Sequence, residues 1–300
     1  MDFSQFAPFW ILFSLLSAFF HASRLAVTKH LSFSFSAKAL TLYVNLASVV
    51  VTFPLIFWNH NFPVEDYRYV GAVLLGGMIS GLGGWSLNHA IKVSEISLVG
   101  PVITLTPGFV IVIEWLITGD LPSSIGLIGI ALLVVGSYIL SVDRGMTHWF
   151  TPLARLFTVS GSRYTLAASA CFATAATFGR VGVRLSDPLS FSVMVSMVNP
   201  LILFILFSLH DRHFYREVFN ENLRREARPL LLLGALFALM RIADQIALSL
   251  TLASYAMSVK RTAGMFSVLL GRLLFHEHRI PEKLIASAVM LLGLFALTQD

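Results

Sequence analysis

Two adjacent cations occur inside an apolar segment of this chain, where a charge is costly. Lys260 and Arg261 lie in the stretch MSVKRTAGMF, residues 257–266. A Lys or Arg at the centre of a bilayer costs about 2.5–3.5 kcal/mol on insertion scales, so the pair needs a physical reason. In one interpretation the pair binds an anion, with Lys260 as a point charge and Arg261 as a two-pronged clamp. In the other, both side chains reach back to the headgroups, because they lie only about 8–10 Å into the segment.

A second polar group lies in the apolar segment LMRIADQIALS, residues 239–249. Arg241 and Asp244 are three residues apart and share one helix face, where each can serve as the counter-ion of the other. The pair either lines a water-filled cavity or belongs to a substrate site. Gln245 follows it, and we expect its amide, like that of Asn88 in an earlier apolar segment, to face the protein interior rather than lipid.

Glu114 and Asp244 are the carboxylates that lie well inside apolar segments. The sequence places no obvious cation beside Glu114, so we expect Glu114 to be the better proton carrier. A hydrogen-bonded acid near the end of its helix is the alternative. Two further pairs of basic residues occur late in their segments, where interfacial positions are the more common explanation: His21 with Arg24, and Arg180 with Arg184.

The sequence lacks the residue patterns of common enzymatic sites. It contains no P-loop and no GxSxG motif, and the histidines of HDRH, residues 210–213, do not have metal-ligand spacing. Cys171 is the single cysteine, which excludes an internal disulfide and a cysteine-based metal cluster. We therefore predict no enzymatic activity, no cofactor and no metal site.

Composition indicates what kind of structure must position these residues. Of 300 residues, 56% are hydrophobic and 12% are charged, and the mean hydropathy is +0.79, whereas soluble domains carry about 25% charged residues. Apolar segments of about 20 residues can cross the hydrocarbon core as helices and are too long for barrel strands. We predict an all-α polytopic membrane protein. Breaks at Pro, Gly and charge clusters delimit ten spans, at residues 8–28, 39–58, 69–90, 95–118, 124–141, 164–184, 190–209, 229–250, 254–275 and 280–298.

The chain also contains an internal repeat. A shift of 157 positions lays residues 97–140 over residues 254–297 without a gap, and nine of the 44 positions are identical. Five spans per repeat is an odd number, so the second repeat enters the membrane inverted, and a substrate site is expected near the midplane between the halves. We predict a first repeat at 1–145, a linking loop at 146–163 and a second repeat at 164–300. The shift pairs Asn88 with Gln245, Asp120 with Glu277, and Gly136 with Gly293.

These features resemble the EamA-type family of the drug/metabolite transporters, whose members have ten helices in two five-helix halves. The resemblance rests on HAIKVSEISLVGPVITLTPGFVIVIEWLITGDLPSSIGLIGIALLVVG and LLFHEHRIPEKLIASAVMLLG and extends over essentially the whole chain. Pro107 matches the family's proline in the fourth helix, and Asp120 and Glu277 match its acidic turns. Gly264 departs from the pattern, because it stands where the second half would carry its own proline. The Lys-Arg pair is also similar to that of plastid sugar-phosphate translocators, in which such a pair holds the phosphate of the substrate.

The distribution of basic residues predicts an orientation. Fourteen Lys and Arg lie in loops and helix ends on one side, and three, Arg68, Arg180 and Arg184, lie on the other. By the positive-inside rule the first side is cytoplasmic and both termini face outward, whereas the resemblance implies termini inside. The outward orientation puts Lys260 and Arg261 in the outer half of the membrane. The net charge of +5 then belongs to loops near anionic lipid and the cytoplasm, not to a nucleic-acid site.

The sequence therefore favours a transporter in the cell membrane, a bacterial inner membrane by the resemblance, that moves a small anionic or zwitterionic metabolite by alternating access without ATP. Its expected partners are the substrate and membrane lipid, with homo-oligomerisation left open. Three alternatives stay open: a proton-coupled exporter of amphipathic or cationic compounds, a lipid flippase, and a non-transporting membrane scaffold. The candidate substrate-binding residues are Lys260, Arg261, Arg241, Asp244, Gln245 and Asn88, with Glu114 as the hypothetical proton-coupling residue.

Overall fold

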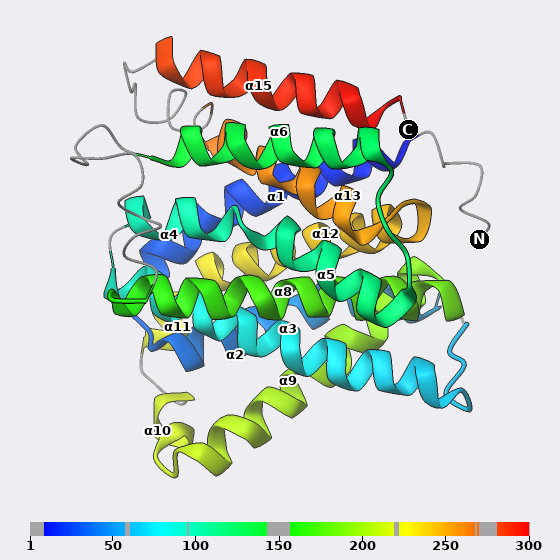
Figure 1. The fold of residues 1–300 in the computed structure, drawn as a ribbon. Helices are drawn as coiled ribbons and strands as arrows, with labels where there is room; N and C mark the ends of the chain where they lie inside the picture. Colours follow the sequence, from blue (N-terminus) through cyan, green and yellow to red (C-terminus); the bar gives the residue numbers. More distant parts are fainter. Residues whose placement is uncertain are drawn as a thin grey trace.

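The computed structural model is a bundle of helices (Figure 1) and describes residues 9–57, 61–94, 96–142, 157–218, 222–267, 269 and 281–299. Within these ranges every regular element is helical, which confirms the all-α prediction. The elements are α1 (Trp10–Leu31), α2 (Ala37–Thr52) with η2 (Phe53–Phe57), α3 (Tyr67–Val93), α4 (Ile96–Ile103), α5 (Thr106–Thr118), α6 (Ser124–Ser141), α8 (Ser160–Leu185), α9 (Pro188–His210), α10 (Phe214–Val218), α11 (Asn222–Arg225), α12 (Ala227–Leu250), α13 (Ala253–Val259) with η3 (Lys260–Thr262), and α15 (Pro281–Leu297).

Eight segments in the described part of the chain are long and apolar enough to cross a membrane, and they coincide with the first eight predicted spans. The chain is therefore a multi-pass membrane protein. The ninth predicted span, residues 254–275, lies only partly within the described residues. Glu277 of the predicted acidic turn lies outside them. The tenth corresponds to α15, whose apolar part, Ile285–Leu297, is shorter than a full span. The predicted count of ten spanning helices therefore stays a prediction.

The fourth predicted span is one helix in the sequence analysis but two in the structure. Helix α4 ends at Ile103 and α5 begins at Thr106, with Pro107 in the first turn of α5. Proline carries no backbone N–H and cannot bond to the carbonyl four residues earlier, which is that of Ile103. The local chain instead closes a tighter turn, in which the Leu105 amide donates to the Val102 carbonyl at 3.2 Å. The proline was identified in the sequence, but the break that it causes was not.

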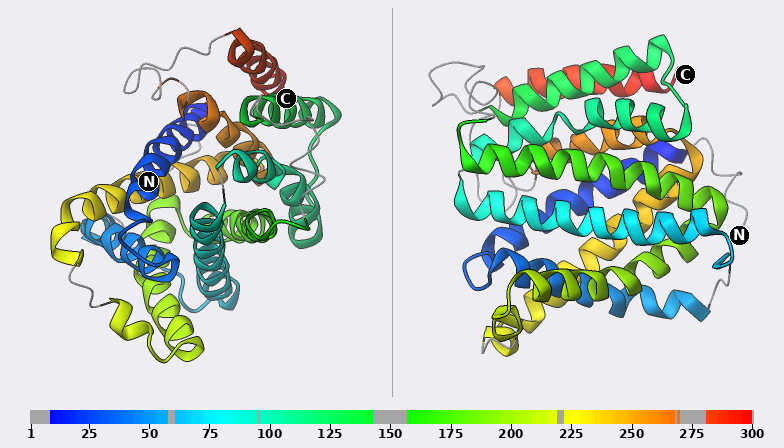
Figure 2. Two further views of the ribbon diagram at one scale, coloured as in Figure 1. Left: turned by 90° about the vertical axis from the view of Figure 1, so that its left-hand side faces the viewer. Right: turned by 60° about the horizontal axis from the view of Figure 1, so that its bottom comes forward.

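The helices pack in a symmetric pattern that relates the two halves. Helix α1 lies against α12, and α3 lies against α8, so the first helix of each half contacts the third helix of the other. Helices α6 and α15 pair along one edge of the bundle, where Figures 1 and 2 both show them side by side. This arrangement supports the predicted two-repeat organisation.

The pairing of α6 with α15 depends on glycine. A Cβ atom added at Gly136 would lie 2.9 Å from the Ala286 carbonyl oxygen, and one added at Gly293 would lie 2.8 Å from the Gly129 carbonyl oxygen. The shift of 157 positions converts the first contact into the second, because it maps Gly136 onto Gly293 and Gly129 onto Ala286. Small residues here let the two backbones approach closely, as in many helix pairs within membranes.

We predict that Gly136→Ala weakens the α6–α15 pair and destabilises the protein by about 1–3 kcal/mol, because the new methyl group overlaps Met290 and the Ala286 backbone. The matched control is Gly71→Ala in α3, where an added Cβ meets nothing within 4 Å. Thermal unfolding in detergent measures both. Equal stability of the two variants would contradict the close approach of the helices.

Candidate substrate site

The centre of the site is the point where two interrupted helices meet. The Ile103 carbonyl, left without a helical partner by Pro107, accepts a hydrogen bond from Arg261 Nη1 at 3.1 Å and another from the Thr106 hydroxyl at 2.6 Å. Arg261 Nε also donates to the Met257 carbonyl at 3.4 Å. Arg261 therefore joins the break of the first half to the helix of the second half that carries it.

Lys260 and Arg261 themselves lie in a break. Helix α13 ends at Val259, residues Lys260–Thr262 form the 3-10 turn η3, and the chain continues as helix at 263–267. The internal repeat maps Lys260 onto Ile103 and Arg261 onto Thr104, so both halves are interrupted at equivalent positions. Discontinuous helices whose ends point into a midplane cavity are typical of secondary transporters.

The side chain of Lys260 is buried and paired. Lys260 Nζ donates to Asp244 Oδ2 at 2.5 Å, and the Ser17 hydroxyl donates to Asp244 Oδ1. Lys260 is 6% exposed and Arg261 7%, which excludes snorkelling to the headgroups as their explanation. The predicted ion pair of Arg241 with Asp244 is wrong, because the carboxylate of Asp244 bonds to Lys260 of η3 and Ser17 of α1 rather than to a residue of its own helix.

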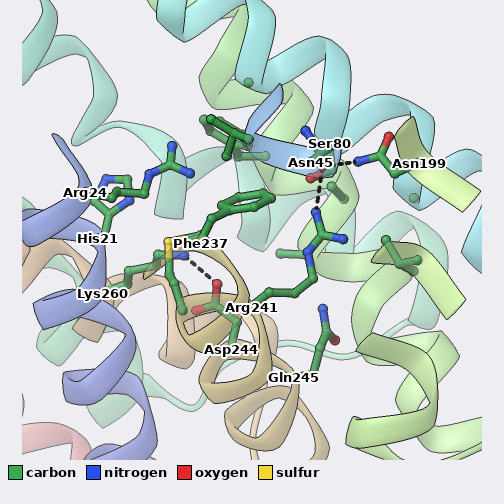
Figure 3. Close-up of a pocket in the computed structure, with 18 of the residues that line it drawn as sticks. His21, Arg24, Asn45, Ser80, Asn199, Phe237, Arg241, Asp244, Gln245 and Lys260 are labelled. Atoms are coloured by element: carbon green, nitrogen blue, oxygen red, sulfur yellow. Dashed lines mark hydrogen bonds and ion pairs between the residues drawn. The ribbon is translucent and has the colours of Figure 1, made fainter. Parts of the chain in front are cut away.

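The predicted substrate residues line a single cavity between the two halves (Figure 3). Its volume, counted as space for the centres of water molecules, is about 120 Å³, and one water needs about 10–15 Å³ on this measure. The cavity thus has room for a small polar solute. The predicted residues that line it are Lys260, Arg261, Arg241, Asp244, Gln245 and Asn88.

Arg241 is held by neutral polar groups. Its Nη1 donates to the Ser196 hydroxyl at 3.2 Å, and its Nη2 donates to Asn45 Oδ1 at 3.3 Å. The Asn199 amide also donates to Asn45 Oδ1, at 3.0 Å. The guanidinium lies over the Phe237 ring, 4.7 Å from its centroid. Arg241 therefore keeps its charge in a buried position without an ion pair in the described part of the chain.

Arg24 is the fourth cation of this cavity, a place that the sequence left as the less favoured alternative. It was expected at the interface, but it is 7% exposed and lines the cavity beside His21. Its guanidinium lies over the same ring of Phe237, 5.0 Å from the centroid. The available signal was the occurrence of a basic residue within an apolar helix. The same kind of signal, an amide within an apolar segment, marks Asn45 and Asn199, which sequence reasoning missed.

The two amides predicted to orient a ligand differ in their bonding. The Asn88 amide donates to the Thr41 hydroxyl at 2.8 Å. The Gln245 oxygen is buried and has no hydrogen-bond partner in the described structure. Gln245 therefore retains an unsatisfied acceptor, and Asn88 is held partly by α2.

Glu114 does not line this cavity, and the expectation that it lacks a cationic partner is wrong. Its carboxylate, fully buried, accepts from Arg180 Nη1 at 2.8 Å and from the backbone amides of Ala253 and Ser254 at 2.8 and 2.9 Å. It thus caps the first turn of α13 and ties α5 to α8. Proton coupling by Glu114 stays a prediction. The bonds to Arg180 and to the two backbone amides are those of a structural carboxylate and do not favour it.

Arg180 organises the end of the bundle where α5, α8 and α13 meet. It is 4% exposed, and it donates to Asp120 Oδ2 at 2.5 Å and to the Thr251 carbonyl at 3.1 Å as well as to Glu114. Burial raises the pKa of Asp120, but the hydrogen bond and charge of Arg180, with Arg184 nearby, outweigh it and hold the pKa below its usual value. This ionic cluster is separate from the cavity.

The fold and the cavity together define a class, the polytopic helical membrane proteins in which a polar site lies between two packed halves. The model of the EamA-like transporter family matches residues 8–142 and 159–299 of this chain. The chain belongs to the EamA-like transporter family, as the resemblance implied, and is thereby a membrane transporter of the drug/metabolite superfamily.

A solved structure titled "Crystal structure of protein" has the same fold. The match has a TM-score of 0.73 and covers 97% of this chain and 96% of that chain, at 16% sequence identity. At this identity the match shows the fold alone. No curated protein matches the chain.

We predict that Glu114→Ala costs about 3–5 kcal/mol of stability, because it leaves buried Arg180 without one of its two carboxylates and two amides of α13 without an acceptor. The matched control is Glu65→Gln, which changes an exposed acid. Thermal unfolding in detergent measures the loss. A change as small as that of the control would show that the cap and ion pair contribute little.

The lowered pKa of Asp120 predicts an acid-labile contribution to stability. Because the folded-state pKa lies below the unfolded value, this contribution is present at neutral pH and is lost as the pH falls through the folded-state pKa. Asp120→Asn should therefore lower stability at neutral pH and flatten its decline in acid, as measured by thermal unfolding across a pH series. An unchanged acid profile would contradict the role of the Arg180–Asp120 pair.

Proposed function

We propose that this protein transports a small organic anion across the membrane by alternating access, without ATP. The observation that carries the proposal is the charge of the cavity lining. Four cations, Lys260, Arg261, Arg241 and Arg24, face one carboxylate, Asp244, among the described lining residues, which leaves a net of +3 with His21 neutral. Burying that excess in a membrane protein is unfavourable unless an anion enters, because pairing offsets part of the desolvation of both partners.

The chemistry of the lining favours carboxylate or phosphate groups. Guanidinium groups donate in a planar fork that matches these anions, and charge-assisted hydrogen bonds are about twice as strong as neutral ones. The amides of Asn88 and Gln245 supply neutral contacts beside the cations. The apolar part of the lining includes Phe172, which is suited to the carbon skeleton of an organic solute.

The interrupted helices support movement of the halves around this site. Breaks at residues 104–105 and 260–262 occupy equivalent positions in the two repeats and both border the cavity. In transporters built from inverted repeats, one half rocks or rotates against the other while the substrate stays near the midplane. Arg261 bonds to the Ile103 carbonyl at the break of the opposite half. A movement of one half against the other would therefore change this contact.

We predict that the double substitution Lys260→Gln with Arg261→Gln abolishes anion transport or reduces it at least about tenfold, because it removes two of the four positive charges of the cavity and leaves the Asp244 carboxylate without its counter-ion, where it repels an anion. Proteoliposomes that contain the purified protein, tested with labelled carboxylates and organic phosphates, provide the measurement. Arg68→Gln, a charge removal at an exposed helix start outside the cavity, is the matched control and should keep wild-type flux.

Membrane insertion and thermal unfolding of the double variant show whether it still folds. Unchanged anion flux in a folded double variant would contradict the site. Flux of organic cations that depends on pH and survives loss of Lys260, with anions inert, would instead support the proton-coupled exporter.

A further inference from the structure

Two of the four cations in the cavity already have partners. Lys260 pairs with Asp244, and Arg261 donates to the carbonyls of Met257 and Ile103. These interactions tie Lys260 to α12 and Arg261 to the break between α4 and α5. The two cations with neither an ion pair nor a backbone-carbonyl acceptor among the described residues are Arg24 and Arg241.

Arg24 has the larger unused hydrogen-bonding capacity. Its Nε atom is buried and has no hydrogen-bond acceptor among the described residues, and it makes no ion pair with them. The neighbouring His21 likewise has a buried Nδ1 atom without a partner. Arg241 donates one hydrogen bond from Nη1 and one from Nη2, of 3.2 and 3.3 Å, to neutral groups. It can therefore also donate stronger hydrogen bonds to an anion.

Phe237 separates the two guanidinium groups. Their Cζ atoms lie 5.0 Å (Arg24) and 4.7 Å (Arg241) from the centroid of its ring, and Figure 3 shows the ring between them. A single carboxylate would have to take the place of the ring to bond to both. The ring attracts each guanidinium by a cation–π interaction.

The surroundings on the two sides of Phe237 differ. In Figure 3, Arg24 lies with His21 and Lys260 on one side, and Arg241 lies with Asn45 and Asn199 on the other. The first side is cationic and the second is rich in amides. The cavity is continuous, because the same lining includes residues from both sides.

We propose that the cavity binds an organic dianion whose two anionic groups occupy separate subsites, one at Arg24 and one at Arg241, on opposite sides of Phe237. This inference rests on the proposed function. It adds that the substrate carries two negative charges and that its two anionic groups are far enough apart to reach both sides of Phe237. Lys260 has Asp244 as its counter-ion, and Arg261 is held by backbone carbonyls. A dianion supplies one counter-charge each for Arg24 and Arg241 and lowers the net charge of the lining from +3 to +1. A monoanion leaves one of these two guanidinium groups, as well as Arg261, without a counter-charge, which is unfavourable.

The test compares matched ligands by their stabilisation of the purified protein, since a ligand stabilises the state it binds according to its concentration over its dissociation constant. The probes are unbranched α,ω-dicarboxylates from succinate to suberate and the monocarboxylates of the same chain lengths. We expect a dicarboxylate of suitable length to stabilise the wild type at a concentration about tenfold or more below that of its matched monocarboxylate.

Arg24→Gln and Arg241→Gln should each remove this preference by weakening the dicarboxylate about tenfold or more while leaving the monocarboxylate nearly unchanged. Lys29→Gln, a charge removal in the same helix as Arg24 but outside the cavity lining, is the control and should keep the preference. Arg24→Lys, which keeps the charge, should retain part of it. Phe237→Leu should shift the preferred length, because it changes the wall between the subsites.

The outcomes separate the two proposals. Stabilisation by neither class of anion, together with an absence of anion flux, would overturn the proposed function. Equal stabilisation of the wild type by monocarboxylates and dicarboxylates, or a preference that persists in folded Arg24→Gln, would overturn the two-subsite inference and leave anion transport standing. If Arg24→Gln does not fold, the wild-type comparison together with Arg24→Lys and Phe237→Leu decides the same question.

Discussion

The structure depends on the cost of placing cations inside the hydrocarbon-spanning part of a protein. Lys260, Arg261, Arg241 and Arg24 are each no more than 7% exposed, and a charge in such surroundings is tolerated only when it is paired or hydrogen-bonded. The chain uses three means of doing so. It pairs Lys260 with Asp244, it directs Arg261 to backbone carbonyls, and it places two guanidinium groups against one phenyl ring.

The backbone breaks follow from the same constraint. Pro107 leaves the Ile103 carbonyl without its helical donor, and such a carbonyl is costly in a dry interior unless it finds a partner. The Thr106 hydroxyl supplies one partner locally, and Arg261 supplies another from the other half of the chain. The freed carbonyl and the buried guanidinium thus bond to each other where the halves meet, and the cavity forms beside them. The end of the bundle near Arg180 is different, because Glu114 and Asp120 hold α5, α8 and α13 together there.

Much of the architecture was predictable from the sequence because its causes are local or periodic. Apolar length predicted the first eight spans, and the gap-free shift of 157 positions aligned Gly136 with Gly293, which the structure places in the contact between α6 and α15. The six proposed binding residues came together because polar groups in spanning helices are driven inward. The individual partners were less predictable. Asp244 has Arg241 three residues away but bonds to Lys260 on another element, and Glu114 finds Arg180 66 positions along the chain. Such choices depend on helix rotation and on distances across the bundle, which periodicity does not specify.

The central claim is that these buried cations are retained because an anionic solute visits them. An experimental structure of the protein with an organic dianion at saturating concentration tests it most directly. The account predicts density for the anion inside the central cavity, with one anionic group at Arg24 and the other at Arg241, and with the Lys260–Asp244 pair beside it. An anion found only at the loops, with lipid or an uncharged compound filling the cavity between the same side chains, would contradict it.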